Sequence, residues 1–288
     1  MIDKFENYRT FMFSIAYRML GSAMEAEDVI HDAYLRLQNK PLEAIDNPKG
    51  YLTTIVTRLC LNQLASAKSQ REQYLGPWLP EPIQTSSILE TQSPIAKVEM
   101  RDSISIAFLL LLESLSPLER AAFLLHDVFG YKHQEIGVML GKSTAACRQL
   151  LRRARNHIAE NRPRFEIDPI QHAQFLNQFI DVVENGEIEK FLQFLADDVV
   201  LVPDGGGERG AAIRVMRGCD AVSAFILGSR RIAPGPLAFE IRQLNGQPAI
   251  MATLENGRPF FALFMQQAND KIQQIHVIAG KKLAYLSQ

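Results

Sequence analysis

One stretch of the chain, from residue 142 to residue 164, is strongly basic, and its only acidic residue is Glu160. Lysines and arginines gathered in this way are the side chains that bind the phosphates of a nucleic acid. A solvated helix face explains the charge equally well, so charge alone leaves both interpretations open. The basic residues of the stretch are Lys142, Arg148, Arg152, Arg153, Arg155, Arg162 and Arg164.

The pattern around Gly141 predicts a helix-turn-helix. Residues 131–140 read as a helix, Gly141 as a turn, and Ser143 as the N-cap of a second helix that runs to about Glu160. Such a second helix enters the DNA major groove, with its first residues nearest base edges and later arginines nearer phosphates. Exposed arginines also occur on other helical hairpins, so this pattern alone does not decide the function. We expect Lys142, Ser143, Thr144, Ala145 and Arg148 near bases, and Arg152, Arg153 and Arg155 near phosphates.

A second group of charged residues, on an expected helix that begins after Ser22, is acidic. Ser22 and Glu25 have the spacing of a capping box. Carboxylates on one helix repel DNA but suit a basic protein partner; the alternative is an ordinary solvated face. The acidic residues are Glu25, Glu27, Asp28 and Asp32.

Two titratable residues near the C-terminus, Asp204 and His276, are candidates for acid–base catalysis, which needs such a group inside an apolar cavity. A structural role is the commoner outcome for a histidine on a strand, and Asp204 stands beside a run of glycines. A third interpretation is a small-molecule sensor lined by apolar strand residues, although core packing explains the same pattern. The apolar residues concerned are Phe260, Phe261, Phe264 and Met265.

The periodicity and composition along the chain predict four segments. Residues 1–74 have helical periodicity, with a turn at 47–50 and a new helix from near Tyr51. Residues 75–95 read as a semi-rigid linker, because three prolines surround Trp78, the only tryptophan. Residues 96–163 are helical again, with a capping box that starts at Ser116.

The last segment, residues 168–288, has a different pattern. Two helices, at about 169–185 and 187–195, precede strand-like runs at 199–202, 238–244, 249–254, 260–266 and 272–278. Asn245-Gly246 and Asn256-Gly257 are hairpin-turn dipeptides. The expected fold class is therefore two all-α domains followed by an α+β domain with a mostly antiparallel curved sheet.

Size and composition limit the classes of protein. A chain of 288 residues with 47% hydrophobic residues can form two or three domains, and its net charge of −1 makes it no general polyanion binder. Cys60, Cys147 and Cys219 form no CxxC pair, which argues against disulfides or a zinc site. The first residues do not resemble a signal peptide, and the longest apolar run, 104–112, is too short to span a bilayer. We expect a cytoplasmic protein without metal, cofactor or membrane association.

Several motifs, in the same order along the chain, resemble a known family. Residues 16–37 resemble sigma region 2.1 to 2.2, residues 47–62 resemble regions 2.3 to 2.4, and residues 116–155 resemble region 4. The chain is thereby identified as a member of the extracytoplasmic-function (ECF) sigma-70 family of RNA polymerase sigma factors. The resemblance implies a non-enzymatic protein that binds core RNA polymerase, through the β′ coiled coil and the β flap, and promoter DNA.

The resemblance also implies roles for individual residues. Region 2 holds a melted strand, which needs cations for phosphates and rings for unstacked bases; Tyr51 can stack, although a role as a core aromatic is open. The implied −10 residues are Asn47, Tyr51, Arg58, Asn62, Lys68 and Arg71. The implied −35 residues are Lys142, Ser143, Thr144, Arg148, Arg152 and Arg155. The implied polymerase-binding residues are Glu27, Asp28, Asp32 and Tyr34.

The linker and the last segment resemble one subgroup, whose members carry a SnoaL-like C-terminal domain with a cone-shaped fold. The resemblance lies in residues 76–82, 204–207 and 245–248; Glu208 and residues 279–283 depart from the subgroup's pattern. It implies that the C-terminal domain regulates the sigma factor, with a small ligand or a protein as a further partner. The implied regulatory contacts are Trp78, Pro80, Asp204, Gly205, Gly206 and Gly207.

Overall fold

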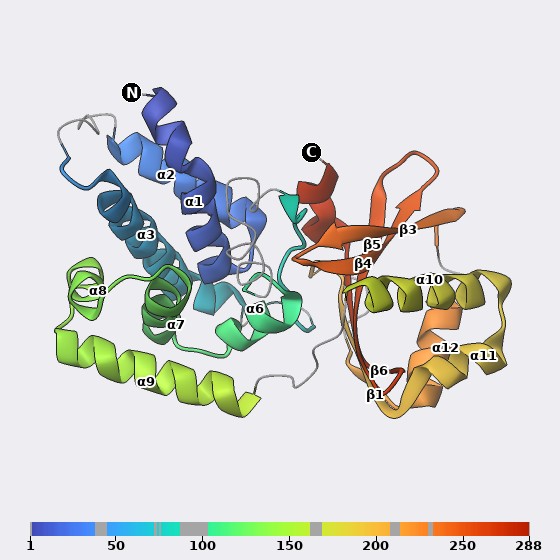
Figure 1. Cartoon of the computed structure of the whole chain (residues 1–288). Coiled ribbons are helices and arrows are strands. Elements are labelled where there is room, and N and C mark those ends of the chain that lie inside the picture. Colours follow the sequence, from blue (N-terminus) through green and yellow to red (C-terminus); the bar gives the residue numbers. More distant parts are fainter. Residues whose placement is uncertain are drawn as a thin grey trace. The chain divides into compact units, whose positions relative to one another are not determined.

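The computed structural model describes residues 2–37, 45–71, 74, 76–86, 103–161, 169–207, 214–229 and 233–287. The chain divides into two compact units (Figure 1). The first comprises residues 1–73 and 85–163, and the second comprises residues 74–84 and 164–288. The segment 74–84, which precedes the helix-turn-helix in sequence, thus groups with the C-terminal residues. Within the described parts of the chain, no helix is both long and apolar enough to cross a bilayer.

The first three helices of the helical unit pack together through buried apolar side chains. They are α1 (Ile2–Leu20), α2 (Ala23–Leu37) and α3 (Pro48–Arg71). Ser22 caps α2 as expected, because its Oγ accepts a hydrogen bond from the amide of Glu25 at 3.1 Å. The expected turn at 47–50 is wrong in part: α3 already begins at Pro48. Asn47 is its N-cap, and its Oδ1 accepts from the amide of Gly50 at 3.0 Å.

The later helices of this unit are α6 (Ile106–Glu113), α7 (Pro117–Phe123), α8 (His133–Leu140) and α9 (Thr144–Asn161). A π-helical turn, Leu124–Val128, extends α7. The capping box at Ser116 is formed as expected, with Pro117 at the first helical position. Gly141 ends α8 in the left-handed conformation, at φ 62°. Gly137 allows the tight turn, since a Cβ there would lie 2.8 Å from the carbonyl oxygen of Lys142.

The two sets of helices pack on each other within this unit, α1 and α3 against α6, α7 and α8. Two arginines are buried where they meet. Arg18 donates from Nε and Nη2 to Ser103 Oγ at 3.1 and 2.8 Å, and Arg120 donates from Nη1 to the carbonyl of Met19. Burial lowers the pKa of Arg18 to about 9 and that of Arg120 to about 10. The packing therefore places two guanidinium groups in a poorly solvated environment.

The second unit is a curved sheet with helices on one face. Its strands are β1 (Leu195–Asp204), β2 (Met216–Arg217), β3 (Leu237–Leu244), β4 (Gln247–Leu254), β5 (Pro259–Ala268) and β6 (Lys271–Ala279). The order is β2-β1-β6-β5-β4-β3. All pairs are antiparallel except β1 with β6. The helices are α10 (Pro169–Asn185), α11 (Ile188–Phe194) and α12 (Cys219–Ser229), and a 3₁₀ helix, η3 (Gly280–Ser287), ends the described chain.

The expected fold class, two all-α domains and an α+β domain with a curved sheet, is confirmed. Asn245 and Gly246 form the β3–β4 turn with φ of 50° and 77°, the conformation that favours this dipeptide. Helix α12, strand β2 and the 3₁₀ helix η3 were not predicted from the sequence. Nor was the parallel pairing of β1 with β6, because alternation of side chains reveals a strand but not its partner.

Candidate functional site

The start of α9 exposes the residues expected to read bases. Ser143 caps this helix, since its Oγ accepts from the amide of Ala146 at 3.2 Å. Lys142, Ser143 and Arg148 are exposed and Thr144 is half-buried. The opposite side of α9 is apolar and buried, which holds the helix on the unit and leaves the basic face free. The buried residues are Cys147, Leu150, Leu151, Ala154 and Ile158.

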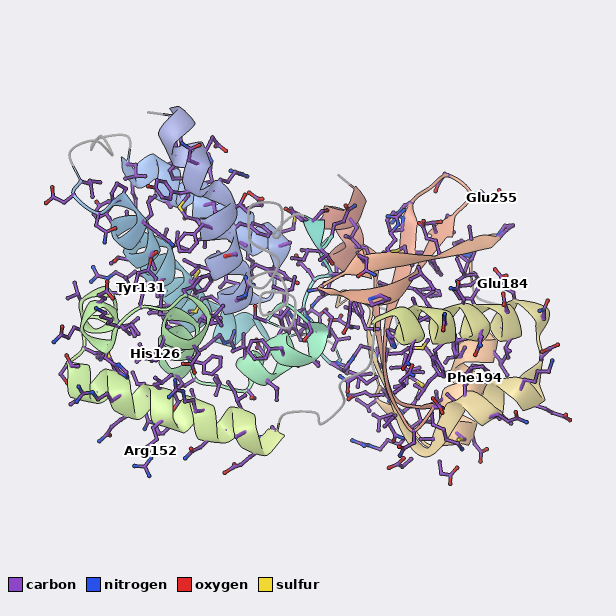
Figure 2. All side chains as sticks on the ribbon, in the orientation of Figure 1. His126, Tyr131, Arg152, Glu184, Phe194 and Glu255 are labelled. Carbon is purple, nitrogen blue, oxygen red and sulfur yellow. The ribbon has the colours of Figure 1, made fainter. Side chains whose placement is uncertain are left out.

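The arginines further along α9 differ in their surroundings, and one of them, Arg153, pairs with Glu119 at 2.8 Å. Arg152 is exposed and extends from α9 away from the other helices (Figure 2). Arg155 forms two hydrogen bonds with the carboxylate of Asp127, at 2.8 and 2.5 Å, and His126 also contacts that carboxylate at 2.7 Å. Burial favours a raised pKa for Asp127, but the hydrogen bonds from Arg155 and His126 outweigh it and lower the pKa. The positive charge of Arg155 is therefore partly neutralised by Asp127, unlike that of Arg152.

Helix α3 places three of the residues expected at the −10 element on one face, because Tyr51, Arg58 and Asn62 are seven and four residues apart. Asn62 is exposed and Tyr51 is half-buried. The exposed Asn47 is engaged as the N-cap of α3. The side chains of Lys68 and Arg71 lie outside the described residues.

Arg58 also contacts the helix-turn-helix. It donates to the last carbonyls of α8, from Nε to Met139 O at 2.9 Å and from Nη2 to Val138 O at 3.1 Å. A cation at a helix C-terminus is stabilised by the unpaired carbonyls there. A second bond nearby, 2.8 Å long, joins the hydroxyls of Thr53 and Tyr131. Helix α3 and the helix-turn-helix are thus connected through a residue expected at the −10 element.

Helix α2 carries the residues expected to bind the polymerase. Asp28 and Asp32 are exposed and one turn apart, whereas Glu27 is paired with Arg9. The ring of Tyr34 packs edge-on against Phe5, with 5.2 Å between centroids. Two large apolar side chains that the sequence analysis did not single out, Met24 and Leu35, are 45% and 44% exposed on the same helix. Exposed apolar side chains beside carboxylates are typical of a protein interface rather than a solvated face.

A buried ion pair between β1 and η3 holds the segment 74–84 on the rest of the C-terminal unit. Asp204, only 2% exposed, lies 2.8 Å from the ammonium of Lys282. The same carboxylate accepts from the amide of Leu79 at 2.6 Å, from the amide of Gly206 at 2.9 Å and from the hydroxyl of Tyr74. Burial and the Asp204 carboxylate raise the pKa of Tyr74 far above its usual range. We call the contacts of Tyr74 and Leu79 with Asp204 and Lys282 the linker clamp.

Lys282 completes the clamp from the other side. Its ammonium donates to the carbonyl of Leu79 and lies 4.2 Å from the centroid of the Trp78 ring. Both main-chain polar groups of Leu79 are therefore bound by the ion pair.

A second contact fixes the end of the segment. The amide of Ile83 donates to Asn245 Oδ1, and the amide of Asn245 donates to the carbonyl of Ile83, both at 3.0 Å. Gln84 then forms a β-bridge with Leu244 at the end of β3. Pro80, Leu79 and Ile83 are buried. The segment 76–84 is thus part of the C-terminal fold.

The glycines after Asp204 permit this close packing. Gly206 and Gly207 have φ of 76° and 73°, a region that glycine enters without strain. A Cβ on Gly207 would lie 2.9 Å from the ring of Tyr74. Gly205 is half-buried between Asp204 and these turns. The glycine run is a close-packed turn and not a loose loop.

The sequence did not indicate the contact roles of Tyr74, Lys282 and Asn245, or those of the main-chain groups of Leu79 and Ile83. Lys282 lies in the segment 279–283, which the sequence analysis treated as a departure from the subgroup's pattern. The signal available was charge: Asp204 was expected to be a contact residue, and a buried carboxylate needs a cation.

The geometry does not favour acid–base chemistry by Asp204 and His276. Leu201 and Ile275 belong to the core under the helices. Because strand residues alternate in direction, Asp204 and His276 point to the opposite face of the sheet. His276 is 2% exposed, its Nε2 has no hydrogen-bond partner among the described groups, and burial lowers its pKa to about 4. No group of three or more His, Cys, Asp or Glu in the described ranges could hold a metal ion.

Comparison with known proteins matches both halves of the helical unit. Residues 5–70 match the family model Sigma-70 region 2, and residues 105–158 match the model Sigma-70, region 4. The ECF RNA polymerase sigma factor SigJ of Mycobacterium tuberculosis is 36% identical over 249 residues, which are 85% of this chain and 79% of SigJ. The probable ECF sigma factor SigI of the same organism is 32% identical over 274 residues, 94% of this chain and 90% of SigI.

The whole chain also resembles a solved structure. The crystal structure of Mycobacterium tuberculosis SigJ has a TM-score of 0.74 and 30% sequence identity, and the match covers 99% of each chain. The likeness therefore extends over the helical unit and the C-terminal unit.

The buried His276 predicts a loss of stability in acid. Its folded pKa, about 4, lies below the value near 6.5 of an unfolded histidine, so as pH falls through 6.5 the unfolded chain binds the proton first. The cost grows until about pH 4, where it reaches about 3 kcal/mol at most. We expect His276→Leu to lose less stability between pH 7 and pH 4.5 than the wild type. Urea unfolding followed by the fluorescence of Trp78, which lies in the same unit, measures this difference.

The exposed His31 offers a matched control, and His31→Leu should leave the Trp78 transition unchanged at both pH values. An equal acid-induced loss in wild type and His276→Leu would contradict the prediction.

Proposed function

Because this chain belongs to the ECF sigma-70 family and is a non-enzymatic sigma factor that initiates transcription, we propose that its C-terminal unit regulates it through the linker clamp. A sigma factor of this family binds RNA polymerase and promoter DNA. The observation that carries the proposal is that Asp204 and Lys282 bind a segment that lies, in sequence, between region 2 and region 4.

The proposed promoter contacts follow the exposed basic surfaces. The start of α9 reads the −35 element with Lys142, Ser143 and Arg148, which are unobstructed within the helical unit. Arg152 contacts phosphates, and Arg155 does so only when it leaves Asp127. The face of α3 with Tyr51, Arg58 and Asn62 holds the −10 element; Lys68 and Arg71 belong to the same proposal. Asn47 contributes as the exposed cap of that helix.

The proposed polymerase contact is the exposed face of α2. Asp28 and Asp32 attract a basic partner, and Met24 and Leu35 supply apolar area beside them. Glu27 and Tyr34 support this face through Arg9 and Phe5. This combination suits the β′ coiled coil, while the helix-turn-helix meets the β flap. A chain with these partners works in the cytoplasm.

Reading both promoter elements requires the helical unit to open. The elements are roughly 25 base pairs apart, on the order of 80 Å along B-form DNA. A compact unit of this length is only about 40 Å across. The packing of α3 on the helix-turn-helix, including the Arg58 contact, is therefore a closed form that must exchange with an open one.

The linker clamp acts on the exchange between the closed and open forms, because it holds part of the chain that connects region 2 to region 4. We retain the domain boundaries of the sequence analysis: region 2 at 1–74, the linker at 75–95, region 4 at 96–163 and the regulatory domain at 168–288. A linker bound along residues 76–84 has less chain available to span the two elements. The clamp thus favours the closed form, and a ligand or protein with higher affinity for the released form favours the open one.

The proposed contact of α9 with the −35 element is tested with Arg148→Ala. Loss of a base contact costs about 1–3 kcal/mol, so we expect transcription from the promoter upstream of its own gene to fall about tenfold or more. Binding to core polymerase should not change. Reconstituted transcription and a polymerase-binding titration measure the two effects.

Arg214→Ala removes another exposed arginine, from the C-terminal unit, and should leave transcription and polymerase binding at wild-type values. Equal transcription by Arg148→Ala and wild type would refute the assignment, and a wild-type chain that does not bind core polymerase would refute the proposed polymerase contact.

The regulatory proposal is tested with Asp204→Asn in the full chain. The change keeps the shape of the side chain but leaves the Lys282 ammonium without its buried counter-charge. We expect the linker to be released, with increased proteolysis within residues 76–86 and several-fold higher promoter-specific transcription.

Asp198→Asn removes an exposed carboxylate from the same strand and serves as the control. Linker release with unchanged transcription would refute the regulatory proposal. A fall in transcription would refute its direction, because the docked linker would then favour transcription.

A further inference from the structure

The helix-turn-helix carries a group of charged and titratable side chains beside the helix that is proposed to read bases. His126 lies close to α9, the helix from which Arg152 extends (Figure 2). We call the group the His126 cluster. Its members are His126 and Asp127 in the π-helical turn, His133 at the start of α8, and Arg148 and Arg155 on α9.

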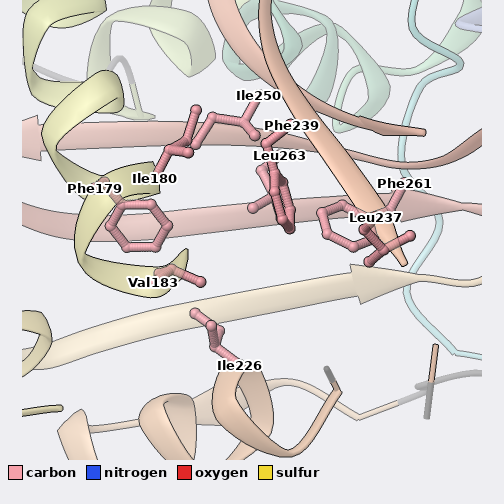
Figure 3. A pocket seen from close by; sticks show the side chains of 9 residues that line it. All are labelled: Phe179, Ile180, Val183, Ile226, Leu237, Phe239, Ile250, Phe261 and Leu263. Atoms are coloured by element: carbon pink, nitrogen blue, oxygen red, sulfur yellow. The ribbon is translucent and has the colours of Figure 1, made fainter. Parts of the chain in front are cut away.

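The C-terminal unit has no comparable group in its cavity. This cavity lies between α10, α12 and the concave face of the sheet, and its described lining consists of nine apolar side chains (Figure 3). No side chain of that lining can bind a proton or a phosphate, whereas every member of the His126 cluster carries or can gain a charge.

Two side chains of the His126 cluster meet at one carboxylate oxygen. Arg155 donates from Nη2 to Asp127 Oδ1 at 2.5 Å and from Nε to Oδ2 at 2.8 Å. Nδ1 of His126 lies 2.7 Å from the same Oδ1 and 3.4 Å from Arg155 Nη2. Arg155 and His126 therefore compete for Asp127.

A proton on His126 decides this competition. When the imidazole is neutral, the charges of Asp127 and Arg155 cancel, and the guanidinium stays at the carboxylate. A protonated imidazole is a hydrogen-bond donor at both nitrogens, so it binds Asp127 and faces Arg155 as a like charge. The total charge of His126, Asp127 and Arg155 then rises from zero to +1.

Arg155 is the cation that leaves. Its side chain is 52% exposed, whereas those of His126 and Asp127 are 27% and 21% exposed. The ring of His133 packs edge-on against His126, with 4.6 Å between centroids, and holds that ring beside the carboxylate. An arginine has a long flexible stem and always carries its charge, so it can reach another anion.

The groups around His126 come from several elements. In the described part of the chain, the charged and titratable ones are Asp127 in the same turn, His133 from α8 and Arg155 from α9. Helix α7 continues into the turn, and α1 supplies Phe11 and Arg18, which both contact the ring of Phe129 at the end of the turn.

The other titratable groups keep their charge state. Burial lowers the pKa of His133, and the positive charges of His126, Arg148 and Arg155 lower it further, against the opposing effect of Asp127. Burial also favours a raised pKa for Asp127, but the hydrogen bonds it receives outweigh this effect and keep it ionised. A proton therefore goes to His126, which faces the carboxylate, and not to His133.

We propose that His126 is a positioning residue for Arg155: protonated His126 replaces Arg155 at Asp127, and the released guanidinium binds a backbone phosphate of the −35 element. Promoter binding then strengthens as pH falls through the range in which histidines titrate. The proposal rests on the contact of α9 with the −35 element proposed above.

The salt dependence of promoter binding counts phosphate contacts and therefore tests the release of Arg155. Each contact with duplex DNA adds about 0.9 to the slope of log K against log salt concentration. We expect the slope of the wild-type holoenzyme to steepen by about one unit between pH 8 and pH 6. Fluorescence anisotropy of a labelled promoter fragment, titrated with holoenzyme at several salt concentrations, measures the slope at each pH.

Two variants remove the parts of the switch. His126→Gln keeps an amide that can bond to Asp127 but cannot gain a proton, so the steepening should vanish. Asp127→Asn removes the charge that holds Arg155 and should give the steeper slope at both pH values.

His157→Gln is the matched control, because it removes a second histidine of α9, whose ring bonds to Ser114 at the end of α6. This variant and His133→Gln should both keep the wild-type response. Groups of the polymerase titrate alike in every holoenzyme, so a difference between variants arises from the substituted residue.

Equal steepening in wild type and His126→Gln would overturn the proposal, and so would a response that is lost in His133→Gln but kept in His126→Gln. If Asp127→Asn does not fold, the comparison of wild type with His126→Gln still decides. Unchanged promoter binding by Arg148→Ala would refute the −35 contact itself. Weakened binding by Arg148→Ala, together with a wild-type slope that is the same at both pH values, would refute only the role of His126.

Discussion

The buried ion pair of Asp204 with Lys282 holds the first part of the segment 74–84, which lies in sequence between region 2 and region 4. Buried charges must be matched by an opposite charge and by hydrogen bonds, or they destabilise the fold. Here the preceding segment supplies part of that match: the Tyr74 hydroxyl, and the amide and carbonyl of Leu79. The C-terminal fold therefore satisfies its own charges through a segment that belongs, in sequence, to the sigma regions.

The helical unit depends on polar contacts of a different kind. Arg18 and Arg120 are buried where the two sets of helices meet, and burial lowers the pKa of both. Around them, Arg58 donates to the end of α8, and Thr53 bonds to Tyr131. Polar groups that have exchanged water for one another lose less on separation than an apolar interface does, since water replaces each bond. Such polar contacts agree with the opening of the helical unit proposed above.

The two faces of the C-terminal sheet carry side chains of different chemistry. The charges, Asp204 above all, lie on the face away from the helix-covered core, and the apolar cavity lies on the concave face. Chemistry of the acid–base type would need both on one side. Asn245, at the end of β3, adds a second contact to the linker.

The sequence by itself determined the local structures, because their causes lie within a few residues of one another. The capping box at Ser116, the turn at Asn245-Gly246 and the two-faced helix after Ser143 are short-range features, and each formed as expected. The motifs of regions 2 and 4 likewise sufficed for the family. Only the tertiary structure decided which distant groups meet. The pairing of Asp204 with Lys282 and the contact of Arg58 with α8 join residues about 80 positions apart, and no local periodicity encodes such a contact.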